Sequence, residues 1–283
     1  MREEDPVREI PAFYGIGLDR RIKDEHEDKH HPVTHAATWP AGRMETFSTS
    51  SSAAMPCLVE SRNQAYSTVE MSETIHFEGI PGAGKSTAAE RMSGLLQAED
   101  IDARWWLEEA SDHPVMPRER RALSAQENFP EICLESWRTF LRDQPCKVAV
   151  LDGYAFQTTV RFMFERLASR ARIDGYFRRW QEISPDTFIA YLHVDSPGTH
   201  FELLMQERGA DWTRKLVAWV ERTPVGRTHG LHGEAGFVVF WKMYQDLCVD
   251  LLGTASVPVE VIEAKCWDDQ YLAGLATKTG LLP

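Results

Sequence analysis

Cysteine and long apolar runs are scarce in this sequence, and both absences exclude classes of protein. The 283 residues include five cysteines, an odd number, and no two of them form a CxxC pair. Such usage is typical of a reducing compartment, and it excludes a disulfide framework or a zinc site built on cysteine pairs. No apolar run approaches the length that crosses a bilayer, and the opening MREEDPVREI lacks the apolar core of a secretory signal. We therefore expect a cytoplasmic protein with no membrane segment.

Positive charge is also in deficit. The chain has 31 Lys and Arg residues against 43 Asp and Glu residues, which gives a net charge of -12. Binding to nucleic acid without sequence preference needs an excess of basic residues on one face, so we expect no nucleic-acid partner. A local basic cluster can still bind a small phosphorylated ligand.

Residues 1–70 differ in composition from the rest of the chain. They contain the charged stretch DRRIKDEHEDKHHPVTH and the small, polar stretch STSSSAAMP, and neither has an apolar period. The four histidines at 26, 30, 31 and 35 match no closed metal site, so a solvated charged tract is the favoured interpretation. Met71 stands just before the first predicted strand. We expect residues 1–70 to be a disordered extension or a misassigned gene start, and residues 71–283 to form one folded domain.

After residue 72 the chain alternates between strand and helix patterns. The pattern predicts strands over 74–78, 103–107, 147–152, 187–194 and 257–264. It predicts helices over 85–98, 156–170, 173–183, 235–252 and 267–276, and another that begins at Pro197 after Ser196 and ends before Gly209. Alternation of this kind favours a parallel sheet with helices on both faces, which is a three-layer α/β domain.

The stretch GIPGAGKS, residues 79–86, matches the phosphate-binding pattern G-x-x-x-x-G-K-[ST] between a predicted strand and a predicted helix. Its glycines let the backbone N–H groups point inward at phosphates. Lys85 can reach the β- and γ-phosphates, and the Ser86 hydroxyl can ligate Mg²⁺. The sequence therefore predicts binding of ATP or GTP with magnesium, through Gly79, Pro81, Gly82, Ala83, Gly84, Lys85, Ser86 and Thr87.

Acidic residues follow two of the predicted strands. Asp152 ends the apolar strand VAVLD, where a Walker-B-type acid serves magnesium, although such a residue can also cap a helix. Glu108 and Glu109 follow the second strand, at the edge where substrates bind in open α/β folds. Either carboxylate can accept a hydroxyl proton, with Glu108 preferred, while Asp112 or His113 orients the substrate. The alternative interpretation is an acidic helix start.

Residues 208–234 concentrate basic side chains within an acidic protein. They hold Arg208, Arg214, Lys215, Arg222 and Arg227. A mobile basic lid that neutralises a transferring phosphoryl group has this composition. We expect Arg208 to act in catalysis and Arg214 and Arg222 to bind the nucleotide, with a solvated basic helix as the alternative.

Three stretches resemble the thymidylate kinase and deoxynucleoside kinase branch of the P-loop kinases. FEGIPGAGKST resembles the first strand and loop of that branch, YLHVDSPGTHFELLMQERG its fourth strand and following helix, and VPVEVIEA its final strand, after which the nucleotide base is packed. The resemblance implies a five-stranded parallel sheet in the order 2-3-1-4-5. It also implies phosphoryl transfer from ATP to a hydroxyl or phosphate, and it makes a homodimer an option.

The chain departs from that family at three places. One is EEASDHPV, which matches neither the nucleotide-kinase nor the nucleoside-kinase version of the corresponding loop cleanly. The Asp-Arg pair after the third strand is Asp152-Gly153 here, so the arginine's phosphate contact is missing or is supplied by Arg161 or the lid. The segment DWTRKLVAWVERT resembles an insertion in the lid. We expect an acceptor pocket built from Trp105, His113, Tyr154, Gln157 and Arg161, although core packing is the expected role of at least one tryptophan of the Trp105–Trp106 pair.

The leading hypothesis is an ATP-dependent kinase for a nucleoside, a nucleotide or a related metabolite. A kinase that modifies an antibiotic or secondary metabolite is a second hypothesis. A nucleotide-binding regulatory ATPase without a small acceptor is the third. A switch GTPase is excluded because the chain has no N/TKxD-type guanine-binding motif late in the sheet.

Overall fold

The computed structural model describes residues 74–108, 110, 113–115 and 127–283. The expected extension over residues 1–70 and the start at Met71 lie outside these residues. So do Glu109 and Asp112 of the predicted acidic segment.

Five strands form one parallel sheet. They are β1 (Thr74–Gly79), β2 (Ala103–Trp106), β3 (Val148–Asp152), β4 (Thr187–His193) and β5 (Val259–Glu263). Their order is β2-β3-β1-β4-β5, and every pairing between neighbours is parallel. The predicted α/β class and the strand order implied by the resemblance are both confirmed.

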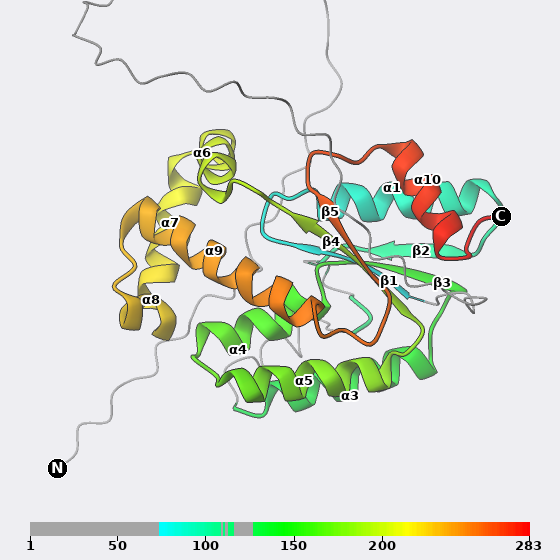
Figure 1. The fold of residues 1–283 in the computed structure, drawn as a ribbon, viewed down its shortest axis with the longest axis horizontal. Coiled ribbons are helices and arrows are strands. Elements are labelled where there is room, and N and C mark those ends of the chain that lie inside the picture. Colours follow the sequence, from blue (N-terminus) through cyan, green and yellow to red (C-terminus); the bar gives the residue numbers. More distant parts are fainter. Residues whose placement is uncertain (1–73, 109, 111–112, 116–126) are drawn as a thin grey trace, which may run out of the picture. The chain divides into compact units, whose positions relative to one another are not determined.

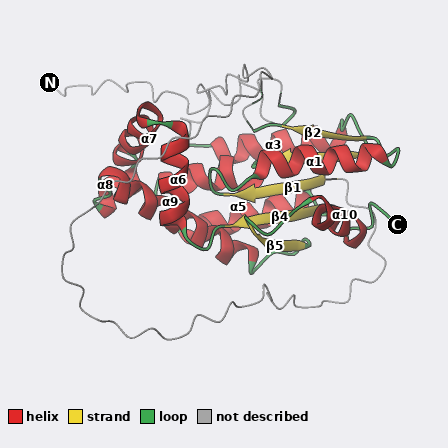
Figure 2. Cartoon of the chain, turned by 90° about the horizontal axis from the view of Figure 1, so that it is seen from above, coloured by secondary structure: helices red, strands yellow, loops and turns green. Residues whose placement is uncertain are grey.

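Helices cover both faces of this sheet. They are α1 (Lys85–Ala98), α3 (Phe129–Arg142), the π-helix η3 (Ala155–Val160), α4 (Arg161–Glu165), α5 (Arg170–Ile183), α6 (Pro197–Arg208), α7 (Ala210–Arg222), α8 (Pro224–His229), α9 (Gly233–Leu252) and α10 (Asp269–Lys278). Helices α1 and α10 lie on one face, and α3 and α5 lie on the other (Figures 1 and 2). The carboxyl ends of the strands point toward the side where α6, α7 and α8 lie (Figure 1).

The buried positions explain why these segments form these elements. All six residues of β1 are buried because the strand lies at the centre of the sheet, between two covered faces. Helix α1 begins and ends where the sequence predicted, and it buries Ala88, Met92 and Leu96 on one stripe. Helix α6 likewise begins at Pro197 and ends before Gly209, as predicted.

The predicted helix over 156–170 is wrong as a single helix. The structure has the π-helix η3 followed by α4, which ends at Glu165, and α5 begins separately at Arg170. Leu167 between them has a positive φ of 57°, which no helix continues through. The basic segment after Arg208 forms α7 and α8, and α7 buries Leu216, Trp219 and Val220.

Two further findings concern the described part of the chain. Its four cysteines, at positions 133, 146, 248 and 266, are free thiols. None of its helices has the combination of length and hydropathy that crossing a bilayer requires.

Candidate nucleotide-binding site

The phosphate-loop residues connect the central strand directly to α1. Gly79, Gly82 and Gly84 all have positive φ, of 147°, 79° and 97°. Ala83 N donates to Ile80 O at 3.2 Å, which closes the turn. The first N–H groups of α1 have no partner within the helix, so the loop and the helix together present donors and a partial positive charge at one point. Thr87, also predicted to bind the nucleotide, is exposed in the first turn.

Lys85 lies buried at the start of α1, with 7% of the residue exposed. Its Nζ donates to Ile80 O at 3.4 Å, a long hydrogen bond back to the loop. An anion in the loop can replace that weak acceptor.

Ser86 and Asp152 are brought together from segments 66 residues apart. Ser86 Oγ donates to Asp152 Oδ2 at 2.6 Å, and Asp152 is buried at the end of β3. A hydroxyl oxygen and a carboxylate oxygen beside a phosphate loop are the donor types that Mg²⁺ prefers. The chemistry of this pair therefore fits the predicted magnesium site.

Glu108 joins this group through Gly153. A Cβ atom on Gly153 would lie 2.9 Å from Lys85 Cε and 3.0 Å from Glu108 Oε2, so both side chains pack against the same backbone position. Glu108 is buried, two residues after β2. The structure thus places a lysine, a strand-end aspartate and a glutamate around one point at the carboxyl edge of the sheet.

The predicted acceptor residues fall into separate groups. The rings of His113 and Tyr154 stack with centroids 4.0 Å apart and an interplanar angle of 16°, and both residues are buried. Gln157 is buried in η3, and its Oε1 has no hydrogen-bond partner among the described residues. Trp105 is partly buried against the core on the edge strand β2, while its neighbour Trp106 packs on Phe140.

Arg161 has a set of partners within its own part of the fold. Its Nε donates to Gln157 O at 2.8 Å, and its guanidinium forms an ion pair with Glu165 and lies 5.5 Å from the centre of the Trp219 ring. Arg161 therefore connects η3 and α4 to α7.

The three arginines predicted to serve the phosphates are exposed in the structure. Arg208 Nε lies 3.9 Å from Glu207, and Arg214 pairs with Asp211 on α7. The backbone carbonyl of Arg222 accepts a hydrogen bond from Arg227. None of the three forms a hydrogen bond with the phosphate loop within the residues that the structure describes, so their role in binding stays a prediction.

Glu78, just before the loop, is a buried acid that the sequence analysis did not single out. Its carboxylate accepts hydrogen bonds from the backbone N–H groups of Ala155, Phe156 and Gln157, at 2.5, 3.1 and 3.4 Å. Burial raises the pKa of Glu78 to about 7, against the lowering effect of these bonds and of Lys85. An acid in a strand predicted to lie at the centre of the sheet was the available signal.

Trp267 is a second residue that the sequence analysis missed. It lies between β5 and α10, and its Cζ2 would be 3.2 Å from a Cβ atom on Gly84. The guanidinium of Arg91 lies 5.8 Å from the Trp267 ring. The indole therefore packs beside the phosphate loop, in the segment where the resemblance implies that the nucleotide base is packed.

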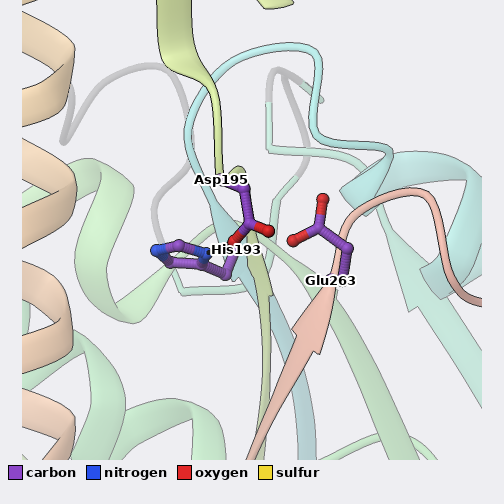
Figure 3. Close-up of side chains that lie close together, drawn as sticks. All are labelled: His193, Asp195 and Glu263. Carbon is purple, nitrogen blue, oxygen red and sulfur yellow. Dashed lines mark hydrogen bonds and ion pairs between the residues drawn. The ribbon is translucent and has the colours of Figure 1, made fainter. Parts of the chain in front are cut away.

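His193, Asp195 and Glu263 form a cluster at the carboxyl ends of β4 and β5, with candidate ligand atoms within 4.8 Å of one another. Figure 3 shows the carboxylates of Asp195 and Glu263 facing each other. Burial, followed by the hydrogen bond to Asp195, raises the pKa of Glu263.

Gln245 fixes which ring nitrogen of His193 carries the hydrogen in the neutral ring. Its Oε1 accepts from Val194 N at 3.0 Å and its Nε2 donates to Val194 O at 2.9 Å, which leaves Nε2 facing His193 Nε2 at 3.3 Å. An amide nitrogen only donates, so His193 Nε2 accepts this hydrogen bond. The ring hydrogen then lies on Nδ1, which donates a hydrogen bond to Asp195 Oδ1 at 3.1 Å. A metal ion at Nδ1 would have to displace that proton, and we assign no metal to this cluster.

No family model and no curated protein matches this sequence. Among solved structures, the chain is similar to the YorR protein from Bacillus subtilis in complex with phosphorylated GDP, with 12% sequence identity and a TM-score of 0.45. That similarity covers 74% of this chain and 96% of YorR. A likeness this weak adds nothing to what the sheet order and the site geometry show.

Proposed function

We propose that this protein is an ATP-dependent phosphotransferase that moves the γ-phosphoryl group to a small acceptor of the nucleoside, nucleotide or related metabolite class. The observation that supports it is the convergence of Lys85 and Glu108 on Gly153, next to the Ser86–Asp152 pair. A phosphate loop alone supports nucleotide binding. A carboxylate beside the loop lysine adds a group that can accept a proton from the attacking hydroxyl.

The residues divide into a nucleotide side and an acceptor side. On the nucleotide side, the loop N–H groups and Lys85 bind the phosphates, and Ser86 and Asp152 would hold Mg²⁺. The ion, when bound, would neutralise charge on the phosphate oxygens. Trp267 offers an indole ring to the nucleotide base beside Gly84.

On the acceptor side, Glu108 would accept the proton of the acceptor hydroxyl as the phosphoryl group is transferred. The stacked rings of His113 and Tyr154 would form an aromatic wall, and the unpartnered Oε1 of Gln157 would offer a hydrogen-bond acceptor in a buried position. Aromatic walls with one amide suit a planar ring that carries N–H donors, which favours a nucleoside-type acceptor. Arg208, Arg214 and Arg222 would supply positive charge as the phosphoryl group moves.

The test measures release of ADP or GDP with Mg²⁺ and ATP or GTP, across a panel of nucleosides, nucleotides and hydroxylated metabolites, antibiotics included. We expect at least one acceptor to stimulate turnover. Lys85→Ala should lower that stimulated rate by about 10³-fold or more, because the lysine charge on the transferring phosphates is lost. Lys147→Ala is the matched control, since Lys147 is exposed just before β3, at the amino end of the sheet.

Two outcomes would contradict the proposal. Stimulated turnover that survives Lys85→Ala would show that the phosphate loop is not the reacting site. Tight nucleotide binding without stimulation by any acceptor in the panel would favour a nucleotide-dependent regulatory protein.

A further inference from the structure

One helix outside the loop is in direct contact with it. His200 of α6 lies with its Nε2 2.8 Å from Pro81 O, in the middle of the phosphate loop. The same ring packs edge-on against Phe201, with centroids 5.1 Å apart. A Cβ atom on Gly82 would lie 3.0 Å from His200 Nε2 and 2.9 Å from Leu204 Cδ2. Helix α6 therefore packs closely against the loop, and a side chain at position 82 would displace His200 and Leu204.

The contact fixes the hydrogen on the His200 ring. A carbonyl oxygen only accepts, so Nε2 carries the proton and donates it to Pro81 O. Burial, and then the nearby positive charges of Lys265 and Lys85, lower the pKa of His200, while the bond to Pro81 raises it. The ring is therefore kept neutral, in the tautomer that holds the loop.

Holding Pro81 O also sets the direction of the next N–H group. The peptide bonds are trans, so the C=O of Pro81 and the N–H of Gly82 point in opposite directions. With the carbonyl turned to α6, the Gly82 N–H points away from α6. Within the part of the chain that the structure describes, that N–H donates to no protein acceptor. It is therefore available to an anion held by the loop.

We propose that His200 is a positioning residue, which holds the Pro81–Gly82 peptide so that the Gly82 N–H is presented to a phosphate oxygen of the bound nucleotide. This inference rests on the nucleotide binding proposed above, and not on transfer to an acceptor. The group recognised is the polyphosphate, so inorganic tripolyphosphate should detect the effect as well as ATP does.

Two substitutions separate the hydrogen bond from simple packing. In His200→Gln the amide nitrogen can take the position of Nε2 and donate to Pro81 O. In His200→Asn the amide nitrogen reaches only the position of Nδ1. Calorimetry with Mg²⁺-ATP and with Mg²⁺-tripolyphosphate should show about fivefold weaker binding for the Asn variant, the worth of one neutral hydrogen bond, and binding within about twofold of wild type for the Gln variant.

A second measurement needs no ligand. In ¹H–¹⁵N spectra of the free protein, the Gly82 amide should shift in His200→Asn and keep its position in His200→Gln, with most other amides unchanged in both. The same spectra also show whether each variant is folded.

The outcomes separate the two proposals. Equal affinity in all three proteins, or equal loss in both variants, would overturn the role of His200 and leave phosphoryl transfer in place. A wild-type protein that binds neither ATP nor tripolyphosphate would overturn the proposed function, and the inference with it.

Discussion

Gly153 is a crowded backbone position of the candidate site. The kinases that this chain resembles have an arginine after the strand-end aspartate, and the sequence predicts that its phosphate contact is missing here or is supplied by Arg161 or the lid. In the structure, Gly153 has a positive φ of 67°, and any side chain there would meet Lys85 and Glu108. The glycine is therefore what allows Glu108 to approach the loop lysine.

A substitution at Gly153 should consequently damage both stability and activity. We expect Gly153→Ala to lower the free energy of unfolding by about 1–3 kcal/mol, because alanine is strained at this φ and its Cβ displaces two buried side chains. Gly94→Ala in α1 is the control: nothing lies within 4 Å of its added Cβ, and it should be neutral or stabilising by up to about 1 kcal/mol. Urea unfolding measures both. Equal stability of wild type and Gly153→Ala would show that the crowding is absent.

At the scale of elements, Arg161 joins three helices through buried contacts. Its partners are Glu165 on α4, the carbonyl of Gln157 in η3 and the ring of Trp219 on α7. The side chains of Arg161 and Glu165 are 7% and 15% exposed, so solvent screens this pair little. Burial raises the pKa of Glu165, and Arg161 opposes that shift. The arginine predicted to contact the acceptor thus has a structural role between α4 and α7.

We expect Glu165→Gln to lower the free energy of unfolding by about 3 kcal/mol, because it leaves the buried guanidinium without its counter-charge. Glu135→Gln in α3 is matched to it, since Glu135 pairs with Arg138 at the surface and should change stability by less than about 1 kcal/mol. Chemical denaturation of the two variants gives the comparison. Similar small losses in both would mean that the α4 pair is solvated.

For the whole molecule, two buried groups on β1 make stability depend on pH in opposite directions. Burial lowers the pKa of His76 from 6.5 to about 3, so between these values only the unfolded chain binds the proton, and the free energy of unfolding rises with pH. Glu78 makes the free energy of unfolding change with pH in the opposite direction. Between 4.5 and about 7 the folded chain holds a proton that the unfolded chain has released, so the free energy of unfolding falls as pH rises.

Glu78→Gln isolates the second effect. The difference between the free energies of unfolding, variant minus wild type, should increase as pH rises from about 4.5 to about 7. For a shift of this size the increase is up to roughly 3 kcal/mol. The loss of carboxylate hydrogen bonds shifts the variant by an amount that does not depend on pH. Urea unfolding across this window measures the difference, and parallel curves for the two proteins would contradict the assigned pKa.

Local pattern was sufficient for the class of sheet, for the bounds of several helices and for the phosphate loop. The bounds of α1, the start and end of α6 and the glycines between β1 and α1 follow from periodicity, capping and turn chemistry, which act within a few residues along the chain. The strand order came from resemblance, because alternation of strands and helices fixes the class of sheet and leaves its order open.

The chemistry of the site depended on contacts between distant segments, which no local pattern encodes. Glu78 accepts hydrogen bonds from the first N–H groups of η3, and the first donor, Ala155, lies 77 residues away along the chain. His200 reaches Pro81 across 119 residues. Glu108 and Lys85 meet only because Gly153, on a third segment, leaves room for both. Tertiary packing alone brings the two members of each pair together, since they lie in or follow different strands of the parallel sheet.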